Sequence, residues 1–241
     1  MTKIYFGTAT EEVTADGIVG LDGRRWLYKD LLPTRWEKIP ARFQEQFGRK
    51  AIYIAIRAMN STKSSIDFLA EWDDMDSYLF RGEEIWIARS NRAHVAFRAR
   101  SPQWTVSVEA GGGLSDAWAV VPRIGKVAFQ KSRCVSRTSI PSPLLKEIVR
   151  RDSRADRFIW WKNVEDGVDG ALRGSLPRDR GFRARFDAIA QPTFARFESI
   201  SLSKQISISC RDGSIGGRFL LPSEAFDYFH RHILPNLSDT T

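Results

Sequence analysis

The sequence has little cysteine and no long apolar run. Its two cysteines, Cys134 and Cys210, each stand without a second Cys or a His at metal-binding spacing. Isolated cysteines of this kind are typical of small buried side chains in a reducing compartment, not of a disulfide framework. The longest apolar stretches, 51–56 and 118–121, are far shorter than the roughly 20 residues that a membrane-spanning helix needs. Since the N-terminus also lacks an apolar signal segment, we expect a soluble cytoplasmic protein without a membrane partner.

The short motifs that fix a reaction are also missing. Gly125-Lys126 has Val120 where a phosphate-binding loop needs glycine, and Val127 where it needs Ser or Thr. The stretch 113–117 departs from the GxSxG frame of a nucleophile elbow, and no strand–helix alternation surrounds it. We therefore predict no cofactor, and we favour a protein that is not an enzyme.

Apolar residues make up 42% of the 241-residue chain, and eight Trp and fifteen Phe supply large side chains for a core. We expect a single globular domain over 1–241. Its internal subdivision would separate a neutral β-rich part, 1–131, from a basic part, 142–236, with a short polar tail at 237–241.

Hydrophobic periodicity predicts an α+β fold, with a mostly antiparallel sheet and about three short helices packed on it. Strand patterns come in runs and do not alternate with helices, which argues against a doubly wound fold. Residues 167–181 hold several glycines and predict a loop. Helices are predicted at 36–47, where Pro40 would separate the first turn, and at 144–150 and 224–233; strands are predicted at 3–6, 50–58, 65–72, 84–88, 93–99, 104–109, 158–161 and 200–210.

Charge is distributed very unevenly along the chain. The formal net charge is +8, and all of this excess lies in residues 121–241, because residues 1–120 hold equal numbers of basic and acidic side chains. Ten basic and three acidic residues fall within 121–157, and aromatic residues follow directly at 158–161. Cations interleaved with aromatic rings are what a phosphate backbone and unstacked bases require.

We therefore predict that the second half binds an anionic partner, nucleic acid in the first place and an acidic protein surface otherwise. If the helix at 144–150 continues past Asp152, four of its arginines share one face, and the tryptophans after it supply stacking. The predicted nucleic-acid-binding residues are Arg133, Arg137, Arg150, Arg151, Arg154, Arg157, Trp160, Trp161, Lys162, Arg178, Arg180, Arg183 and Arg185.

The segment 67–84 offers an alternative of a different class, because it holds seven carboxylates against one arginine. Converging carboxylates can hold Mg²⁺ for phosphodiester cleavage. No lysine stands two residues after Glu83 or Glu84, as a restriction-type nuclease would require. The candidate catalytic residues of this alternative are Asp67, Glu71, Asp73, Asp74 and Glu84.

A third alternative is a homo-oligomeric assembly or interaction protein. In it, the acidic segment 67–84 of one copy docks on the basic segment 121–157 of the next.

Overall fold

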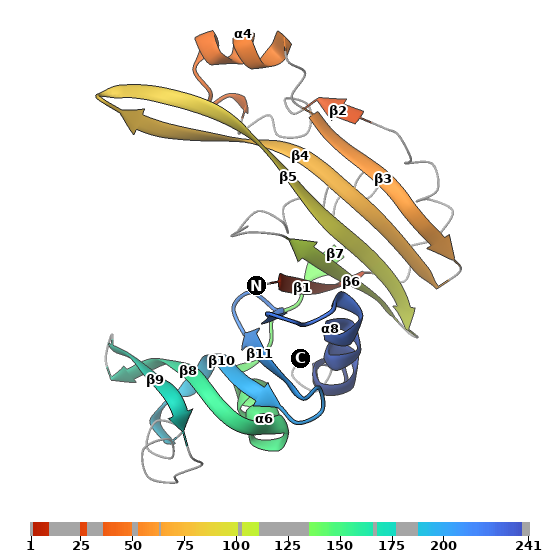
Figure 1. Cartoon of the computed structure of the whole chain (residues 1–241), viewed down its shortest axis with the longest axis vertical. Helices are drawn as coiled ribbons and strands as arrows, with labels where there is room; N and C mark the ends of the chain where they lie inside the picture. Colours follow the sequence, from red (N-terminus) through yellow and green to blue (C-terminus); the bar gives the residue numbers. More distant parts are fainter. Residues whose placement is uncertain are drawn as a thin grey trace. The chain divides into compact units, whose positions relative to one another are not determined.

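The computed structural model describes residues 2–9, 25–27, 36–49, 53–62, 64–100, 103–110, 135–165, 168–176 and 188–237 (Figure 1). Over these residues twelve strands form an antiparallel sheet structure accompanied by three helices, which confirms the predicted α+β class. No helix in the described ranges is long and apolar enough to cross a membrane.

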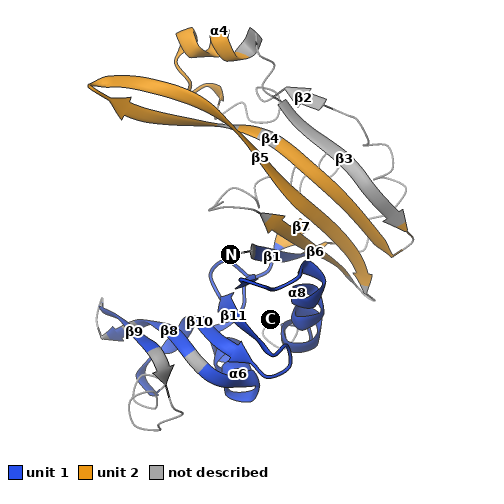
Figure 2. Cartoon of the chain, in the orientation of Figure 1, with its two compact units in different colours: residues 1–7, 111–113, 137–241 blue, residues 8–110, 114–136 orange. Residues whose placement is uncertain are grey.

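The chain divides into two compact units (Figure 2). Unit 1 comprises residues 1–7, 111–113 and 137–241, and unit 2 comprises residues 8–110 and 114–136. Most of the first strand, β1 (Thr2–Ala9), therefore belongs to the unit that also holds the C-terminal half. The predicted subdivision by charge had placed this strand in the neutral part, 1–131.

Unit 2 is built around a meander in the order β2-β3-β4-β5-β6. Its described elements are β2 (Arg25–Leu27), helix α4 (Ala41–Arg49), β3 (Tyr53–Thr62), β4 (Ser65–Phe80), β5 (Glu83–Arg100) and β6 (Gln103–Ala110), and the short β7 (Val135–Arg137) crosses from unit 2 into unit 1. The prediction of separate strands at 84–88 and 93–99 was wrong, because β5 runs through both and pairs with β4 without a register shift.

Side chains that alternate to one face of β4 and β5 form the core of unit 2. Phe68 and Phe97 are fully buried and pack edge to face with ring centres 5.9 Å apart. Before α4, the amide of Ile39 donates a hydrogen bond to the carbonyl of Trp36. The continuous helix begins only after Pro40, as the sequence predicted.

The strands of unit 1 lie in the order β1-β12-β11-β10-β8-β9. Their bounds are β8 (Ser153–Glu165), β9 (Val168–Leu176), β10 (Gln191–Ser199), β11 (Lys204–Ser209) and β12 (Ser214–Gly217); the helices are α6 (Ser142–Asp152) and α8 (Pro222–Tyr228), followed by a π-helical turn, Phe229–Ile233, and a 3-10 turn, Leu234–Asn236.

Two local predictions in unit 1 were wrong, and a helix extension that the sequence left open does not occur. The predicted loop at 167–181 is a strand, β9, over Val168–Leu176, since pairing with β8 overrides its glycines. The predicted strand at 200–210 begins only at Lys204, after a turn. The helix at 144–150 does not continue past Asp152, because Ser153 is already extended.

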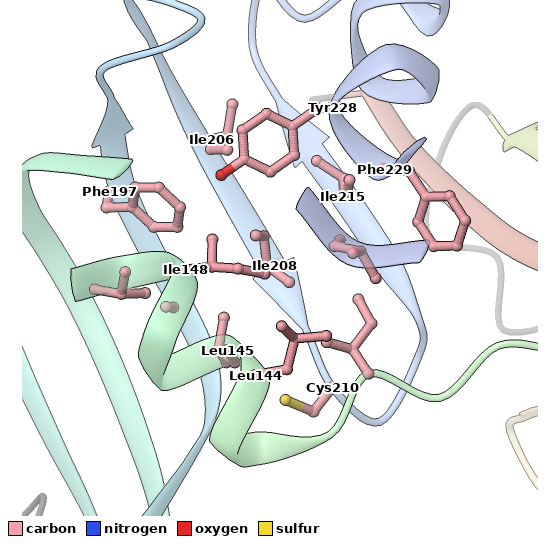
Figure 3. Close-up of a cluster of buried hydrophobic side chains, with 14 of the residues drawn as sticks. Leu144, Leu145, Ile148, Phe197, Ile206, Ile208, Cys210, Ile215, Tyr228 and Phe229 are labelled. Atoms are coloured by element: carbon pink, nitrogen blue, oxygen red, sulfur yellow. The ribbon is translucent and has the colours of Figure 1, made fainter. Parts of the chain in front are cut away.

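Both helices of unit 1 pack on the same face of its sheet. Figure 3 shows Leu145 and Ile148 of α6 and Tyr228 of α8 directed at Ile206 and Ile208 of β11. Cys210 lies in the same cluster, and burial raises the pKa of its thiol to about 11, so the group stays protonated and unreactive at neutral pH. Cys134 lies outside the described residues.

Candidate nucleic-acid interface

Strand β8 contributes one set of side chains to the core and another to the opposite face of the sheet, which neither α6 nor α8 covers. Ile159 and Trp161 are buried in the cluster beneath α6 and α8. Because successive side chains of a strand point to opposite faces, Phe158, Trp160 and Lys162 point away from both helices. Trp160 is 40% exposed and Lys162 is exposed.

Pairing with β9 and β10 places neighbours on either side of these outward residues. Phe158 lies in register between Arg173 of β9 and Arg196 of β10. Two residues farther along β8, Trp160 lies between Ala171 of β9 and Phe194 of β10. The outward residues therefore form two adjacent rows across three strands, a basic–aromatic–basic row and a row with two aromatic residues.

The ring of Phe158 contacts the other two aromatic rings of these rows. Phe158 lies 6.2 Å from Trp160 and 5.8 Å from Phe194 between ring centres. The indole Nε1 of Trp160 donates a hydrogen bond to the carboxylate of Asp169 at 3.1 Å, which fixes the ring orientation. Ala171, the neighbour of Trp160 on the β9 side, is too small to cover the indole. We call Phe158, Trp160, Phe194, Lys162, Arg173 and Arg196 the β8–β10 platform.

Charge around the platform is dominated by cations. Lys162 and Arg173 are exposed and Arg196 is half-buried. Glu198, two residues beyond Arg196, faces two further cations, with Arg154 and Arg157 each 3.7 Å from its carboxylate. Two guanidinium groups thus share one carboxylate at this end of β8.

Other predicted arginines lie away from the platform. Arg150 and Arg151 stand in the last turn of α6, which packs on the other face of the sheet, and Arg151 is paired with Glu147. Arg154 and Arg157 belong to β8, so the expected helical face of four arginines does not form.

Arg137 is held by the turn that follows β11. Its guanidinium donates two hydrogen bonds to the main-chain carbonyl of Asp212, at 3.1 and 2.8 Å. Partial burial raises the pKa of Asp212, but the Lys3 ammonium, 2.6 Å away, and Arg137 outweigh it and hold this pKa below its usual value. Arg137 therefore has a structural role in this turn.

The two predicted stacking residues differ. Trp161 is fully buried in the core and offers no ring face to a base, so of the two only Trp160 can stack. Arg133, Arg178, Arg180, Arg183 and Arg185 lie outside the described residues.

Sequence reasoning missed Phe194 and Arg196, because it assigned no strand to 191–199. The signal was present in the alternation of Phe194, Arg196 and Glu198 with the buried Ala195 and Phe197. Arg173 was not among the predicted binding residues, and its segment was predicted to be a loop.

The candidate catalytic carboxylates of segment 67–84 are spread along a strand. Asp67 and Asp73 are six residues apart in β4, which corresponds to about 20 Å of extended backbone. Glu84 stands in register with Leu79 near the far end of the hairpin. Among the described residues no three His, Cys, Asp or Glu side chains converge on a point where an ion could bind.

Three carboxylates of this segment have local partners instead. Asp67 is 2.8 Å from Arg98, Asp73 accepts a hydrogen bond from Ser90, and Asp76 is 2.8 Å from Arg89. Glu71 stands in register with Arg92, and the side chain of Asp74 is not described. The structure therefore gives the phosphodiesterase alternative no site in the part of the chain it describes.

No protein-family model matches the chain, and no curated protein matches it significantly.

Proposed function

We propose that unit 1 binds single-stranded nucleic acid on the β8–β10 platform. The observation that carries this proposal is the position of Trp160, exposed on the face of the sheet opposite α6 and α8 and flanked by Phe158, Lys162 and Arg173. Every base has a π-face, so an exposed indole can stack on a base without reading its identity. Cations along the same rows would then contact the phosphates between stacked bases.

Several properties of the platform support a single strand in preference to a duplex. The aromatic rings lie on a pleated sheet face, where only splayed, unstacked bases can reach them. The cations occupy three neighbouring strands, a spacing suited to a backbone that crosses the sheet. A duplex would present phosphates to the cations but would leave the indole without a base to stack on.

Fluorescence anisotropy of a labelled single-stranded oligonucleotide tests this function, using RNA and DNA of the same sequence at 50 and 200 mM salt. Binding should weaken with salt, with a slope of roughly −0.7 in log affinity per phosphate contact. The double variant Lys162→Ala/Arg173→Ala should reduce that slope by about 1.4.

The matched control is Arg150→Ala/Arg151→Ala, which removes two exposed cations from α6 on the other face of the sheet. It should leave the salt slope nearly unchanged. Absence of binding at 50 mM salt would exclude the proposed function, and equal effects of the two double variants would exclude the platform as its site.

A further inference from the structure

The hairpin of β4 and β5 continues well beyond the sheet of unit 2. Among the described residues, β3 pairs with Ser65–Trp72 of β4 and β6 pairs with Ala93–Arg100 of β5, and neither pairs farther along the hairpin. Residues 73–92 therefore form a two-stranded ribbon, extending about 26 Å past the last rung of β3. Figure 1 shows the two strands running on together past the ends of their neighbours. We call this segment the β4–β5 ribbon.

The ribbon ends in a tight turn that its sequence specifies. Phe80 and Glu83 are the last residue pair, and Arg81 and Gly82 between them have φ values of 51° and 83°. Two consecutive positive φ values are the geometry of a type I′ hairpin turn, which keeps the twist of both strands. The ribbon is therefore a regular element with a defined end.

One face of the ribbon is apolar and exposed. The register pairs Tyr78 with Ile85, and Phe80 and Ile87 point to the same side by alternation. The exposed fractions of Tyr78, Phe80, Ile85 and Ile87 are 47%, 58%, 38% and 50%. Four large apolar side chains gathered on one face at this exposure are typical of an interaction surface.

The charges of the ribbon restrict what can cover this face. Residues 73–92 hold five carboxylates and three arginines, so the ribbon is net acidic. Such a segment is repelled by a phosphate backbone and by an anionic lipid surface. It is attracted to a surface that combines apolar side chains with cations.

Unit 1 carries a surface of that kind between β12 and α8. Phe219 and Leu221 are 72% and 57% exposed, although Leu220 between them is buried. The guanidinium of Arg218 lies over the Phe219 ring, 5.3 Å from its centre. Apolar area and positive charge thus occur together within four residues.

From this complementarity we infer that the apolar face of the β4–β5 ribbon docks on the Arg218–Phe219–Leu221 surface of a second copy of this chain. In the contact, Phe80 and its neighbours cover Phe219 and Leu221, and Glu83 pairs with Arg218. The two surfaces differ, so the contact is heterologous, and repetition generates a ring or an open chain. It uses none of the residues of the β8–β10 platform.

Sedimentation velocity of the full chain, freed of nucleic acid by nuclease treatment, tests the inference over a range of protein concentrations at 50 mM salt. The wild-type chain should self-associate. Phe80→Ser/Ile87→Ser should raise the dissociation constant by at least about tenfold, because it removes two apolar contacts. Leu79→Ser, at a residue that is 78% exposed on the opposite face of the ribbon, is the matched control and should leave association unchanged.

Charge reversal makes the test specific to the partner surface. Glu83→Arg and Arg218→Glu should each weaken association, and the combination of both should restore it. Circular dichroism of each variant confirms folding. A wild-type chain that stays monomeric, variants that associate as the wild type does, or a double reversal weaker than either single one would overturn the inference. Flotation of the chain with anionic vesicles, lost in Phe80→Ser/Ile87→Ser, would overturn it in favour of a lipid surface.

Discussion

The carboxylate of Asp152, the last residue of α6, accepts a hydrogen bond of 2.8 Å from the Tyr228 hydroxyl, at the end of α8. The same carboxylate accepts a bond from the Ser199 hydroxyl of β10 and one from the amide of Ser201. Burial alone would raise the pKa of Asp152, but these three bonds outweigh it and hold this pKa below its usual value. One carboxylate thus joins both helices of unit 1 to its sheet.

Removal of this carboxylate should be costly. Asp152→Ala leaves the Ser199 and Tyr228 hydroxyls buried without their acceptor, and we expect a loss of about 2–4 kcal/mol in the free energy of unfolding. Tyr228→Phe removes a single donor and should cost about 1 kcal/mol. Urea denaturation followed by circular dichroism measures both values. Equal losses in the two variants would contradict the central place of Asp152.

Mild acid should weaken unit 1 through His232. Burial lowers the pKa of His232, against the opposing effect of Asp152 and with a smaller lowering by Arg231. The folded state therefore favours neutral imidazole, so this contribution is present above the ordinary histidine pKa of about 6.5 and is lost as the pH falls below it. Between pH 7.5 and pH 5.5 the free energy of unfolding should fall in the wild type. It should fall less in His232→Gln, and an identical fall in both would rule out His232 as the cause.

Two glycines with positive φ should differ sharply in their tolerance of alanine. At Gly213, with φ +54°, an added Cβ would lie 1.8 Å from the main-chain oxygen of Thr138, so Gly213→Ala should cost more than about 3 kcal/mol. At Gly82, with φ +83°, nothing lies within 4 Å, so Gly82→Ala should cost only about 1–2 kcal/mol from backbone strain. Thermal denaturation of the two variants checks the difference. Similar losses in the two variants would mean that the backbone around Gly213 can move to accommodate a Cβ atom.

Local patterns predicted the fold class but not the lengths and partners of its strands. Pro40 predicted the late start of α4, because proline has no backbone N–H to donate to a helix hydrogen bond. The end of α6 at Asp152 depends instead on Ser199 and Ser201, about fifty residues later, which no local pattern reveals. Pairing with β8 also makes a strand of glycine-rich β9, which the sequence alone marks as a loop.

The candidate site was predictable in composition but not in arrangement. Adjacent residues of a strand face opposite sides, so Trp160 and Trp161 could not both lie on one binding face. Only the packing of α6 and α8 decides that Trp161 is the buried one. The neighbours of Trp160 come from β9 and β10, and their register is a long-range property of the sheet.

The most direct test of the central claim, base stacking on Trp160, is a comparison of two labelled strands of equal length by fluorescence anisotropy at 100 mM salt. One strand carries bases and the other is abasic, so both present the same phosphates. The wild-type chain should bind the strand with bases at least about tenfold more tightly, and Trp160→Ala should lose most of this preference. Equal affinity of the wild type for the two strands, or an undiminished preference in Trp160→Ala, would contradict the account.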